Sequence, residues 1–326
     1  MCTSVLSTES TKIDFDAFLN KHDKHCHPGQ YQERHDIYHE NVQKIEVLNK
    51  KYEHLEFEMN EYGDYTSEEF DTHYKGYSKP HFVGRTKSCS KYTQKIMEYI
   101  NNYLHGTDDE LDWRTKNAVT SVKNQGQCGS CWSFSAAGAM EGAWALASGN
   151  LVDLSEQQLM DCSKSYVNFG CNGGEMDSAF EYAIDTGMCL DSEVPYTAVS
   201  NKCTTSEQNC TKTATFSYCM DVPSENELAL QSAVNLSPVS VAIEADTTVF
   251  QFYTSGVLTS EECGTNLDHG VLVVGYGSDD GQDYWIVKNS WGEDWGENGY
   301  IRIARSSSVD DMGVCGIAMM PSFIVV

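Results

Sequence analysis

The amino-acid sequence predicts an α+β protein of two lobes with a cleft between them. Helical spacing of apolar residues dominates the middle of the chain, and strand patterns dominate from Pro238 onward. Helices and strands that are segregated along the chain are typical of α+β folds. With 326 residues, of which 40% are apolar, the chain can bury one or two ordinary cores. A cleft between two such lobes is a common place for a ligand.

The N-terminal third begins with a helical pattern. From Asp14 to Lys51, apolar residues recur at helical spacing among charged ones, which predicts long amphipathic helices packed on one another. Residues 55–62 alternate like an edge strand. Thr66 has Glu69 three positions later, which is the spacing of a helix-starting capping box. We therefore expect helices, a strand and a further helix in this order.

The next stretch is predicted to be a connection between two units. Residues 75–87 contain proline, glycine and lysine and are expected to be exposed. Helical spacing returns over residues 91–104, and the acidic residues 106–110 end it. An exposed acidic segment of this kind predicts a boundary that proteases can cut.

Beyond Leu111 the pattern changes. Residues 130–147 predict a helix with Ser130 as N-cap and Gly149 as its stop. Shorter helices are expected over residues 154–160 and 176–184. Period-2 alternation and β-branched residues predict strands over Val239–Ile243, His269–Val274, Tyr284–Lys288 and Tyr300–Ile303.

Charge excludes some partners. The formal net charge is -26; residues 1–110 carry 13 basic and 20 acidic groups, and residues 111–326 carry 9 and 28. A surface this acidic repels phosphate backbones and anionic lipid, so we expect no nucleic-acid partner. No apolar stretch is long enough to span a bilayer, so no membrane insertion is expected.

Cysteine content favours an oxidising compartment. Thirteen cysteines, ten of them after Leu111, indicate disulfides and a secretory route. Sequons at Asn209 and Asn235 permit glycosylation but arise often by chance. Residues 1–7 lack a basic segment and an apolar run, so the sequence shows no clear signal peptide. Either a signal has been trimmed or export is unconventional.

One cysteine and one histidine stand out as a catalytic pair. Nine of the ten histidines lie in the first 105 residues, so His269 is the sole imidazole beyond Leu111. Cys131 opens the helix predicted from Ser130, where the helix dipole stabilises a thiolate. His269 can hold the thiol proton and deliver it to a leaving amine. Cys128-x-x-Cys131 alone would also fit a redox dithiol or half a zinc site, but zinc would need a second such pair, which is missing.

Two amides complete the candidate site. Asn289 can orient His269 without removing its positive charge, and Trp291 can shield that hydrogen bond from water. Gln125 can aim its amide NH2 at the oxyanion of a tetrahedral intermediate, beside the backbone N–H of Cys131. These neighbours make the catalytic interpretation of Cys131 much stronger than the redox or zinc one.

These residues resemble the active site of papain-family cysteine peptidases, specifically the cathepsin L-like branch with its propeptide attached. The Cys-Gly-Ser-Cys-Trp run is a signature of that family, and His269 and Asn289 follow the nucleophile at the expected separations of 138 and 158 residues. The match includes Asp112-Trp113-Arg114, Cys171-Asn172-Gly173-Gly174 and Gly299-Tyr300. The resemblance implies a papain-like fold with a helical left lobe and a β-barrel-like right lobe, preceded by a helical propeptide.

The resemblance also implies that residues 1–108 are an inhibitory propeptide and residues 109–326 the peptidase domain. Two propeptide motifs carry it, one in Arg34, Asn41, Ile45 and Asn49, the other in Asn60, Tyr62 and Asp64. Gln30, Tyr38 and Glu58 depart from the usual residues. The helical signal over residues 91–104 departs further, since propeptides of the family pass through the cleft extended. Protonation of the propeptide histidines near pH 5–6 is a hypothesis for release; most of them are expected to be solvated.

Family disulfides transfer as Cys128–Cys171, Cys162–Cys203 and Cys263–Cys315. Cys189, Cys210 and Cys219 then have no assigned partner, and Cys210 could compete with Cys203 for Cys162. Parity leaves one of these three thiols free if the mature domain is otherwise closed.

For substrates, the resemblance places the pocket for the second residue before the cut at Met176, Ala242, Leu267, Gly270 and Met320, with Trp291 also in the cleft. An apolar pocket predicts a preference for Leu, Val or Phe. Gly173 and Gly174 are expected to pair with the substrate backbone, and Glu175 lies at the rim.

The resemblance implies an acid-activated endopeptidase that needs no cofactor and no metal. Expected partners are protein and peptide substrates, the protein's own propeptide and cystatin-like inhibitors. The expected location is a lysosome-like or digestive compartment, or outside the cell. The alternative is a catalytically silent relative used for binding, inhibition or storage.

Overall fold

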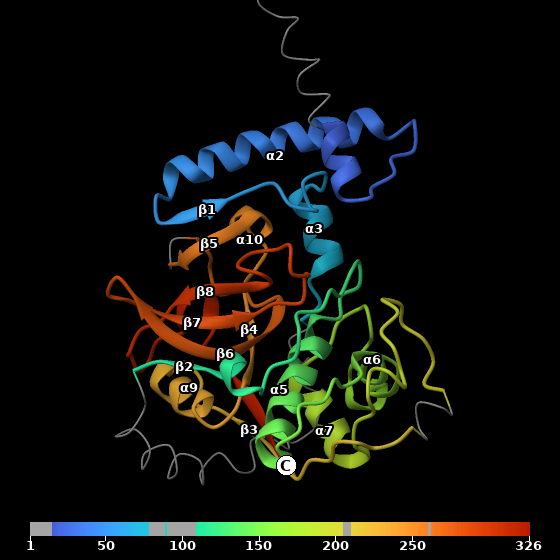
Figure 1. Ribbon diagram of the computed structural model, residues 1–326, viewed down its shortest axis with the longest axis vertical. Helices are drawn as coiled ribbons and strands as arrows, with labels where there is room; N and C mark the ends of the chain where they lie inside the picture. Colours follow the sequence, from blue (N-terminus) through green and yellow to red (C-terminus); the bar gives the residue numbers. More distant parts are fainter. Residues whose placement is uncertain (1–14, 78–88, 90–108, 205–209, 260–261) are drawn as a thin grey trace, which may run out of the picture.

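A computed structural model of the chain describes residues 15–77, 89, 109–204, 210–259 and 262–326. The N-terminal unit lies across one end of the molecule, the strands fill the middle, and helices α5, α6 and α7 flank the strands (Figure 1). The C-terminus lies at the end opposite to α2.

The N-terminal unit contains a helix over residues 15–21 and then α2 (Tyr31–Lys51), β1 (Leu55–Phe57) and α3 (Ser67–Tyr74). α2 has an acidic residue in its first turn and lysines in its last, which suits the helix dipole. α3 begins with the predicted capping box between Thr66 and Glu69. The strand expected over residues 55–62 is shorter than predicted, because residues 61–64 form a turn.

The first propeptide motif holds this unit together. Arg34 on α2 makes a two-pronged ion pair with Glu69 on α3, at 2.7 Å for each nitrogen–oxygen pair. The Asn41 amide donates to the carbonyls of Gly63 and Tyr65. Asn49 makes two hydrogen bonds to the backbone of Phe57, and so aligns β1 beside α2. Tyr38, a departure from the motif, is buried against Phe15 and Phe18.

The helical lobe is built around α5 (Cys131–Ser148) with α6 (Glu156–Cys162) and α7 (Met176–Thr186). Ser130 is the N-cap of α5 as predicted, although its hydroxyl bonds to Tyr196 instead of capping the helix. Gly149 ends α5 in the left-handed conformation with φ of 77°. A Cβ at Gly138 would lie 2.7 Å from Leu272, so the absence of a side chain allows α5 to pack closely on the sheet.

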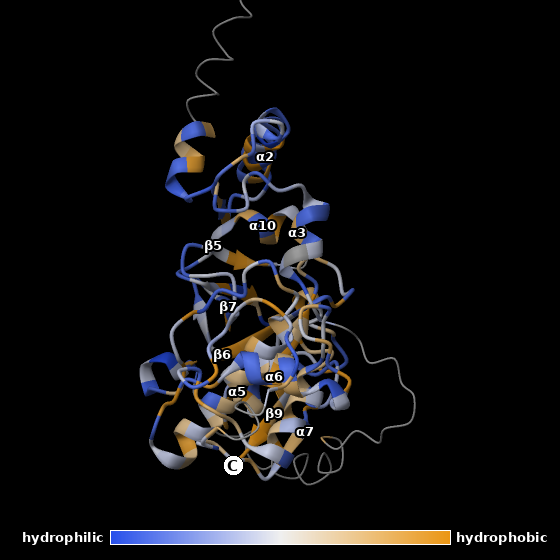
Figure 2. Ribbon diagram, turned by 90° about the vertical axis from the view of Figure 1, so that its right-hand side faces the viewer, coloured by the Kyte–Doolittle hydropathy of each residue, from blue (hydrophilic) through white to orange (hydrophobic). Residues whose placement is uncertain are grey.

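The strand lobe is a mixed sheet in the order β1-β5-β8-β7-β6-β4-β9-β3, with β2 paired to β6. β5 and β8 are parallel, and the other neighbouring pairs are antiparallel. Apolar segments gather where β6 and β9 lie beside α5 (Figure 2). The strands are β2 (Leu111–Asp112), β3 (Tyr218–Asp221), β4 (Val239–Ile243), β5 (Tyr253–Leu258), β6 (His269–Asp279), β7 (Gln282–Lys288), β8 (Tyr300–Ala304) and β9 (Ser322–Val325).

The strand β4 has the predicted bounds, and β6, β7 and β8 extend the predicted strands by one or more residues. Sequence patterns did not reveal β3, β5, β9 or the helices α9 (Glu227–Val234) and α10 (Thr248–Phe252). The helix predicted over residues 91–104 lies outside the described residues. Within the described part of the chain, no helix has the length and apolarity needed to cross a membrane.

The disulfides correct one expectation. The three family pairs are present: Cys128–Cys171, Cys162–Cys203 and Cys263–Cys315. Cys189 pairs with Cys210, and Cys219 pairs with Cys89 of the N-terminal third. The expectation that Cys189, Cys210 or Cys219 stays free was wrong, because Cys219 pairs with Cys89, which precedes Leu111. In the described ranges the free cysteines are Cys26 and Cys131.

Candidate active site

The nucleophile candidate lies at the junction of the two lobes. Cys131 is the first residue of α5, and its Sγ accepts a hydrogen bond of 3.2 Å from the backbone N–H of Gly270 on β6. The side chain is fully buried. Burial raises the pKa of the Cys131 thiol to about 12, so the thiol keeps its proton in this state.

The base candidate is the residue before Gly270. The Nε2 atom of His269 lies 2.8 Å from Oδ1 of Asn289, and the backbone N–H of Ser290 also donates to that oxygen. Because a side-chain oxygen can only accept, Nε2 carries the hydrogen and Nδ1 is the proton-accepting position. Nδ1 is buried and has no hydrogen-bond partner among the residues that the structure describes. Burial lowers the pKa of His269 to about 4, which keeps the ring neutral.

Trp291 covers the His269–Asn289 pair. The rings of Trp291 and His269 are 4.6 Å apart at an angle of 30°, and the indole is fully buried. Tyr62 and Phe70 of the N-terminal unit pack edge-on against the same indole. Trp291 therefore covers the candidate base and also packs against the N-terminal unit.

The side-chain amide of Gln125 is fully engaged in hydrogen bonds in this structure. Its Nε2 donates to the carbonyls of Cys128 at 2.8 Å and Tyr74 at 3.1 Å, while its Oε1 accepts from Ser290. Trp291 donates to the same Tyr74 carbonyl at 3.1 Å. The amide predicted to stabilise an oxyanion thus holds a carbonyl of the N-terminal unit.

The segment after Tyr74 runs across the cleft and contacts both lobes. The N–H of Tyr77 donates to the carbonyl of Asp268, and the carbonyl of Gly76 accepts from the N–H of Gly174, each at 3.0 Å. Lys75 lies 2.9 Å from the Asp268 carboxylate and also pairs with Asp71. Gly76 approaches the backbone of Gly129 so closely that a Cβ would overlap it. Sequence reasoning missed Lys75 and Asp268, since nothing in the sequence brings them together.

The residues predicted to line a substrate pocket are largely buried in this structure. Met176, Ala242 and Leu267 belong to one buried cluster with Tyr77, and Met320 packs against that cluster. A Cβ on Gly270 would meet Met176 at 3.2 Å, which places it at the same wall. Gly174 donates to the Gly76 carbonyl of the crossing segment, whereas Gly173 bonds within its own loop, to Phe169 and Gly170.

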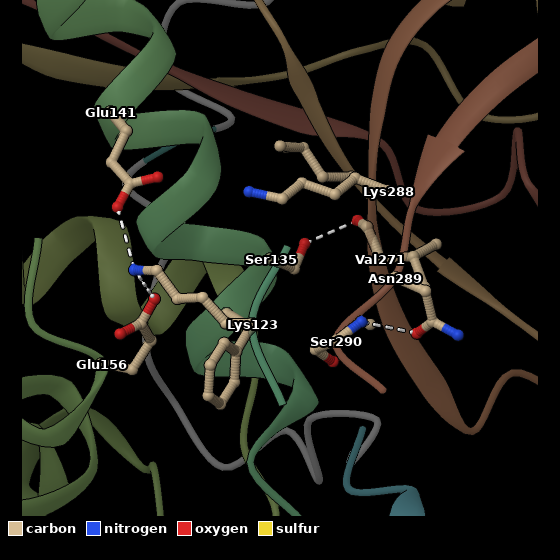
Figure 3. Close-up of a pocket in the computed structure, with 11 residues that line it drawn as sticks. Lys123, Ser135, Glu141, Glu156, Val271, Lys288, Asn289 and Ser290 are labelled. Atoms are coloured by element: carbon tan, nitrogen blue, oxygen red, sulfur yellow. Dashed lines mark hydrogen bonds and ion pairs between the residues drawn. The ribbon is translucent and has the colours of Figure 1, made fainter. Parts of the chain in front are cut away.

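A small pocket behind Asn289 contains buried charges between the lobes. Figure 3 shows Lys288 of β7 extending toward α5, and Lys123 lying between Glu141 and Glu156. Lys123 pairs with Glu156 at 2.6 Å and with Glu141 at 3.2 Å. Burial opposes the charge on Lys123, but the neighbouring carboxylates outweigh it and raise its pKa. Lys288 donates to Thr120, and these contacts join β7 to the helical lobe.

Comparison with known proteins agrees with this geometry. Residues 107–325 match the model of the papain family of cysteine proteases, and residues 15–70 match the cathepsin propeptide inhibitor domain. The chain is 42% identical over 298 residues to the probable cysteine protease RDL2 of Arabidopsis thaliana, covering 90% of this chain and 80% of that one. It is 43% identical over 303 residues to the oryzain beta chain of Oryza sativa subsp. japonica, covering 90% of this chain but only 62% of that longer protein.

A solved structure is also similar over its whole length. It is the digestive procathepsin L 3 from the larval midgut of Tenebrio molitor, with a TM-score of 0.82 and 40% identity over 99% of this chain and 100% of that one. That structure is a proenzyme, so the N-terminal unit and the two lobes have a common arrangement in both proteins.

Proposed function

Because the chain belongs to the papain family of cysteine proteases and carries a propeptide inhibitor domain, we propose that it is a cysteine endopeptidase made as a zymogen. The observations that support this most are the bond from Cys131 to Gly270, the residue that follows His269, and the bond from Gln125 to the propeptide carbonyl of Tyr74. We place the division between propeptide and peptidase near residue 108, just before β2.

Peptide hydrolysis would start with transfer of the Cys131 proton to Nδ1 of His269. The thiolate then attacks the carbonyl carbon of the substrate, and the oxyanion is stabilised by the Gln125 amide and the Cys131 N–H. His269 returns the proton to the departing amine, leaving an acyl-enzyme. Water, deprotonated by His269, attacks the acyl carbon, and the thiol is restored with release of the second product. Asn289 holds the imidazole in the orientation that these proton transfers need.

The propeptide would prevent this sequence in two ways. It buries Cys131 and His269, so that burial disfavours both the thiolate and the imidazolium. It also occupies the Gln125 amide with the Tyr74 carbonyl. Removal of the propeptide returns water to the cleft and frees the amide, which makes the charged pair accessible.

The apolar cluster that contains Tyr77 supports a preference for a hydrophobic residue two positions before the cut. Met176, Ala242 and Leu267 are apolar and belong to the same buried cluster as Tyr77, although the carboxylates of Glu175 and Asp177 also lie close enough to act on Tyr77. Leu, Val or Phe would bury apolar surface there, whereas a charged side chain would lose its hydration. As for location, we propose that the protein acts in a lysosome-like or digestive compartment, or outside the cell.

Hydrolysis of a fluorogenic peptide with Leu at that position, at about pH 5 with a reducing agent, tests the proposal. Acid-processed protein should cleave the peptide, and Cys131→Ala should not. Cys26→Ala is a matched control, because Cys26 is the other free thiol in the described residues and lies in the propeptide. It should leave the rate unchanged. A folded chain whose propeptide is demonstrably gone, yet which shows no turnover, would instead favour the silent relative.

A further inference from the structure

The disulfide between Cys89 and Cys219 crosses the boundary that proteolysis has to cut. Cys89 precedes the proposed division near residue 108, and Cys219 lies in β3 of the peptidase domain. Both are almost fully buried in the core that also contains Cys131. The disulfide therefore lies in the interior of the zymogen and not on its surface.

This bond attaches the propeptide to the peptidase domain at a point far from the main docking surface of the propeptide. The helical unit binds at the end of the molecule that carries β5, where β1 pairs with β5 (Figure 1). β3 lies near the opposite end, beside the C-terminus. Between these points, Lys75 to Tyr77 cross the cleft. The propeptide is thus held by a sheet contact, a cleft contact and a covalent bond.

A single cut near residue 108 breaks none of these. The cut peptide remains attached through Cys89, and a tethered ligand has an effective concentration on the order of 1 mM at its site. Dilution cannot remove it, and it rebinds the cleft after each opening. Cleavage alone should therefore leave the enzyme inhibited.

We propose that the Cys89–Cys219 disulfide is a redox lock on activation, so that release of the inhibitor needs a thiol reductant as well as proteolysis. The proposal rests on the proposed function, in that the propeptide is taken to be the inhibitor of this peptidase. It concerns a bond that plays no part in the catalytic steps.

A dithiol is a sufficient reductant for this bond. One thiolate of the dithiol attacks a sulfur of the disulfide, the S–S bond breaks, and a mixed disulfide forms while the other cysteine leaves as thiolate and takes up a proton. The second thiol of the dithiol then displaces the remaining cysteine, which is also protonated. Two electrons pass to Cys89 and Cys219, and the dithiol becomes a disulfide.

The first readout needs no peptidase activity. A recognition sequence for a serine protease is inserted after Gly106 in the Cys131→Ala chain, which is then cut without reductant. The propeptide should stay with the peptidase domain on a denaturing gel run without reductant, and should separate when a dithiol is added. Cys89→Ser in the same chain should release it without reductant. If the protease-cut chain that retains Cys89 separates without reductant, the proposal is overturned, whether or not the protein is a peptidase.

The second readout is activity in the chain with Cys131 intact and the same inserted sequence. Cut without reductant at about pH 5, it should show less than about a tenth of the activity of the Cys89→Ser/Cys219→Ser double variant, as an effective concentration in the millimolar range predicts. A dithiol should bring the two within about twofold. The double variant also shows that Cys131 itself needs no reductant in this preparation.

Cys189→Ser/Cys210→Ser is the matched control, since it removes a disulfide that lies wholly within the peptidase domain. It should remain locked like the parent chain. If the cut parent chain is as active as the double variant before any reductant is added, the lock is disproved. The same holds if the zymogen's own processing at about pH 5 cuts between Tyr77 and Cys89, because that cut would free the inhibitor while the disulfide persists.

Discussion

The propeptide and the peptidase domain differ in where their apolar side chains are buried. The peptidase domain buries its large residues in its own two lobes. The propeptide has a small separate core around Phe15, Phe18 and Tyr38, while Tyr62, Phe70 and Tyr74 are buried in a cluster that includes Trp291 of the other domain. The propeptide thus depends on contacts with the peptidase domain, which suits an inhibitory unit that has to be removed.

The largest effect on this dependence should come from Phe70→Ala. The ring is buried 5.0 Å from the Trp291 indole, and loss of a buried Phe costs about 3–5 kcal/mol. We expect the propeptide to dock at least about a hundredfold more weakly. Alkylation of Cys131 in the intact zymogen, measured by mass spectrometry, should accelerate accordingly. Val47→Ala, at an exposed position of α2, should change nothing; equal rates for both variants would contradict the comparison.

Acid should weaken the folded zymogen through His269. Its pKa is about 4 in the folded state against an ordinary value of 6.5, so the unfolded chain takes up more protons as the pH falls from 6.5 to 4. His269 contributes up to roughly 3 kcal/mol to the free energy of unfolding above pH 6.5, and this contribution is lost as the pH falls from 6.5 to 4.

Urea unfolding of the Cys131→Ala zymogen at several pH values measures this loss. The Cys131→Ala/His269→Asn chain should lack that part of the pH dependence, while contributions from Asp268 and other groups remain. Parallel pH profiles for the two chains would show that His269 does not contribute.

Lys75→Met tests the polar contact in the cleft. The ammonium lies 2.9 Å from Asp268 in a largely buried setting, where a charged hydrogen bond is worth about 2 kcal/mol. We expect zymogen processing at about pH 5 to be faster by roughly tenfold, as the loss of this contact weakens docking. Lys44→Met removes a more exposed pair with Glu40 on α2 and should have little effect.

The smallest effect is expected within the propeptide itself. Arg34 binds Glu69 through two nitrogens, and lysine cannot reproduce that geometry. Because both side chains are partly exposed, Arg34→Lys should cost only about 1 kcal/mol. Hydrogen exchange of α3 should rise modestly, with no change in β4 or β6. A change spread over the peptidase domain would mean that the two units are not as separate as described.

Local patterns in the sequence predicted the elements that carry the chemistry. The helix that begins at Cys131, the strand that begins at His269 and the capping box at Thr66 are each set by neighbouring residues, so they were predictable. β3 and β9 were missed, because short strands without clear alternation depend on their pairing with each other.

Contacts between distant residues were beyond reach. The resemblance brought the pocket residues together, but Cys89–Cys219 and Lys75–Asp268 join segments 130 and 193 residues apart. Parity among the mature cysteines misled, since it assumed that the domain closes on itself. The sequence suggested a catalytic role for the Gln125 amide, but its bond to Tyr74 depends on how the propeptide docks.

In the zymogen, the propeptide should hold Cys131 and His269 buried and uncharged. Alkylation by iodoacetamide at pH 6 tests it most directly, with Cys26 as an internal reference in the zymogen. We expect Cys131 to react at least about a hundredfold more slowly in the zymogen than in the processed enzyme, because burial suppresses the reactive thiolate. Equal rates in the two forms would contradict it.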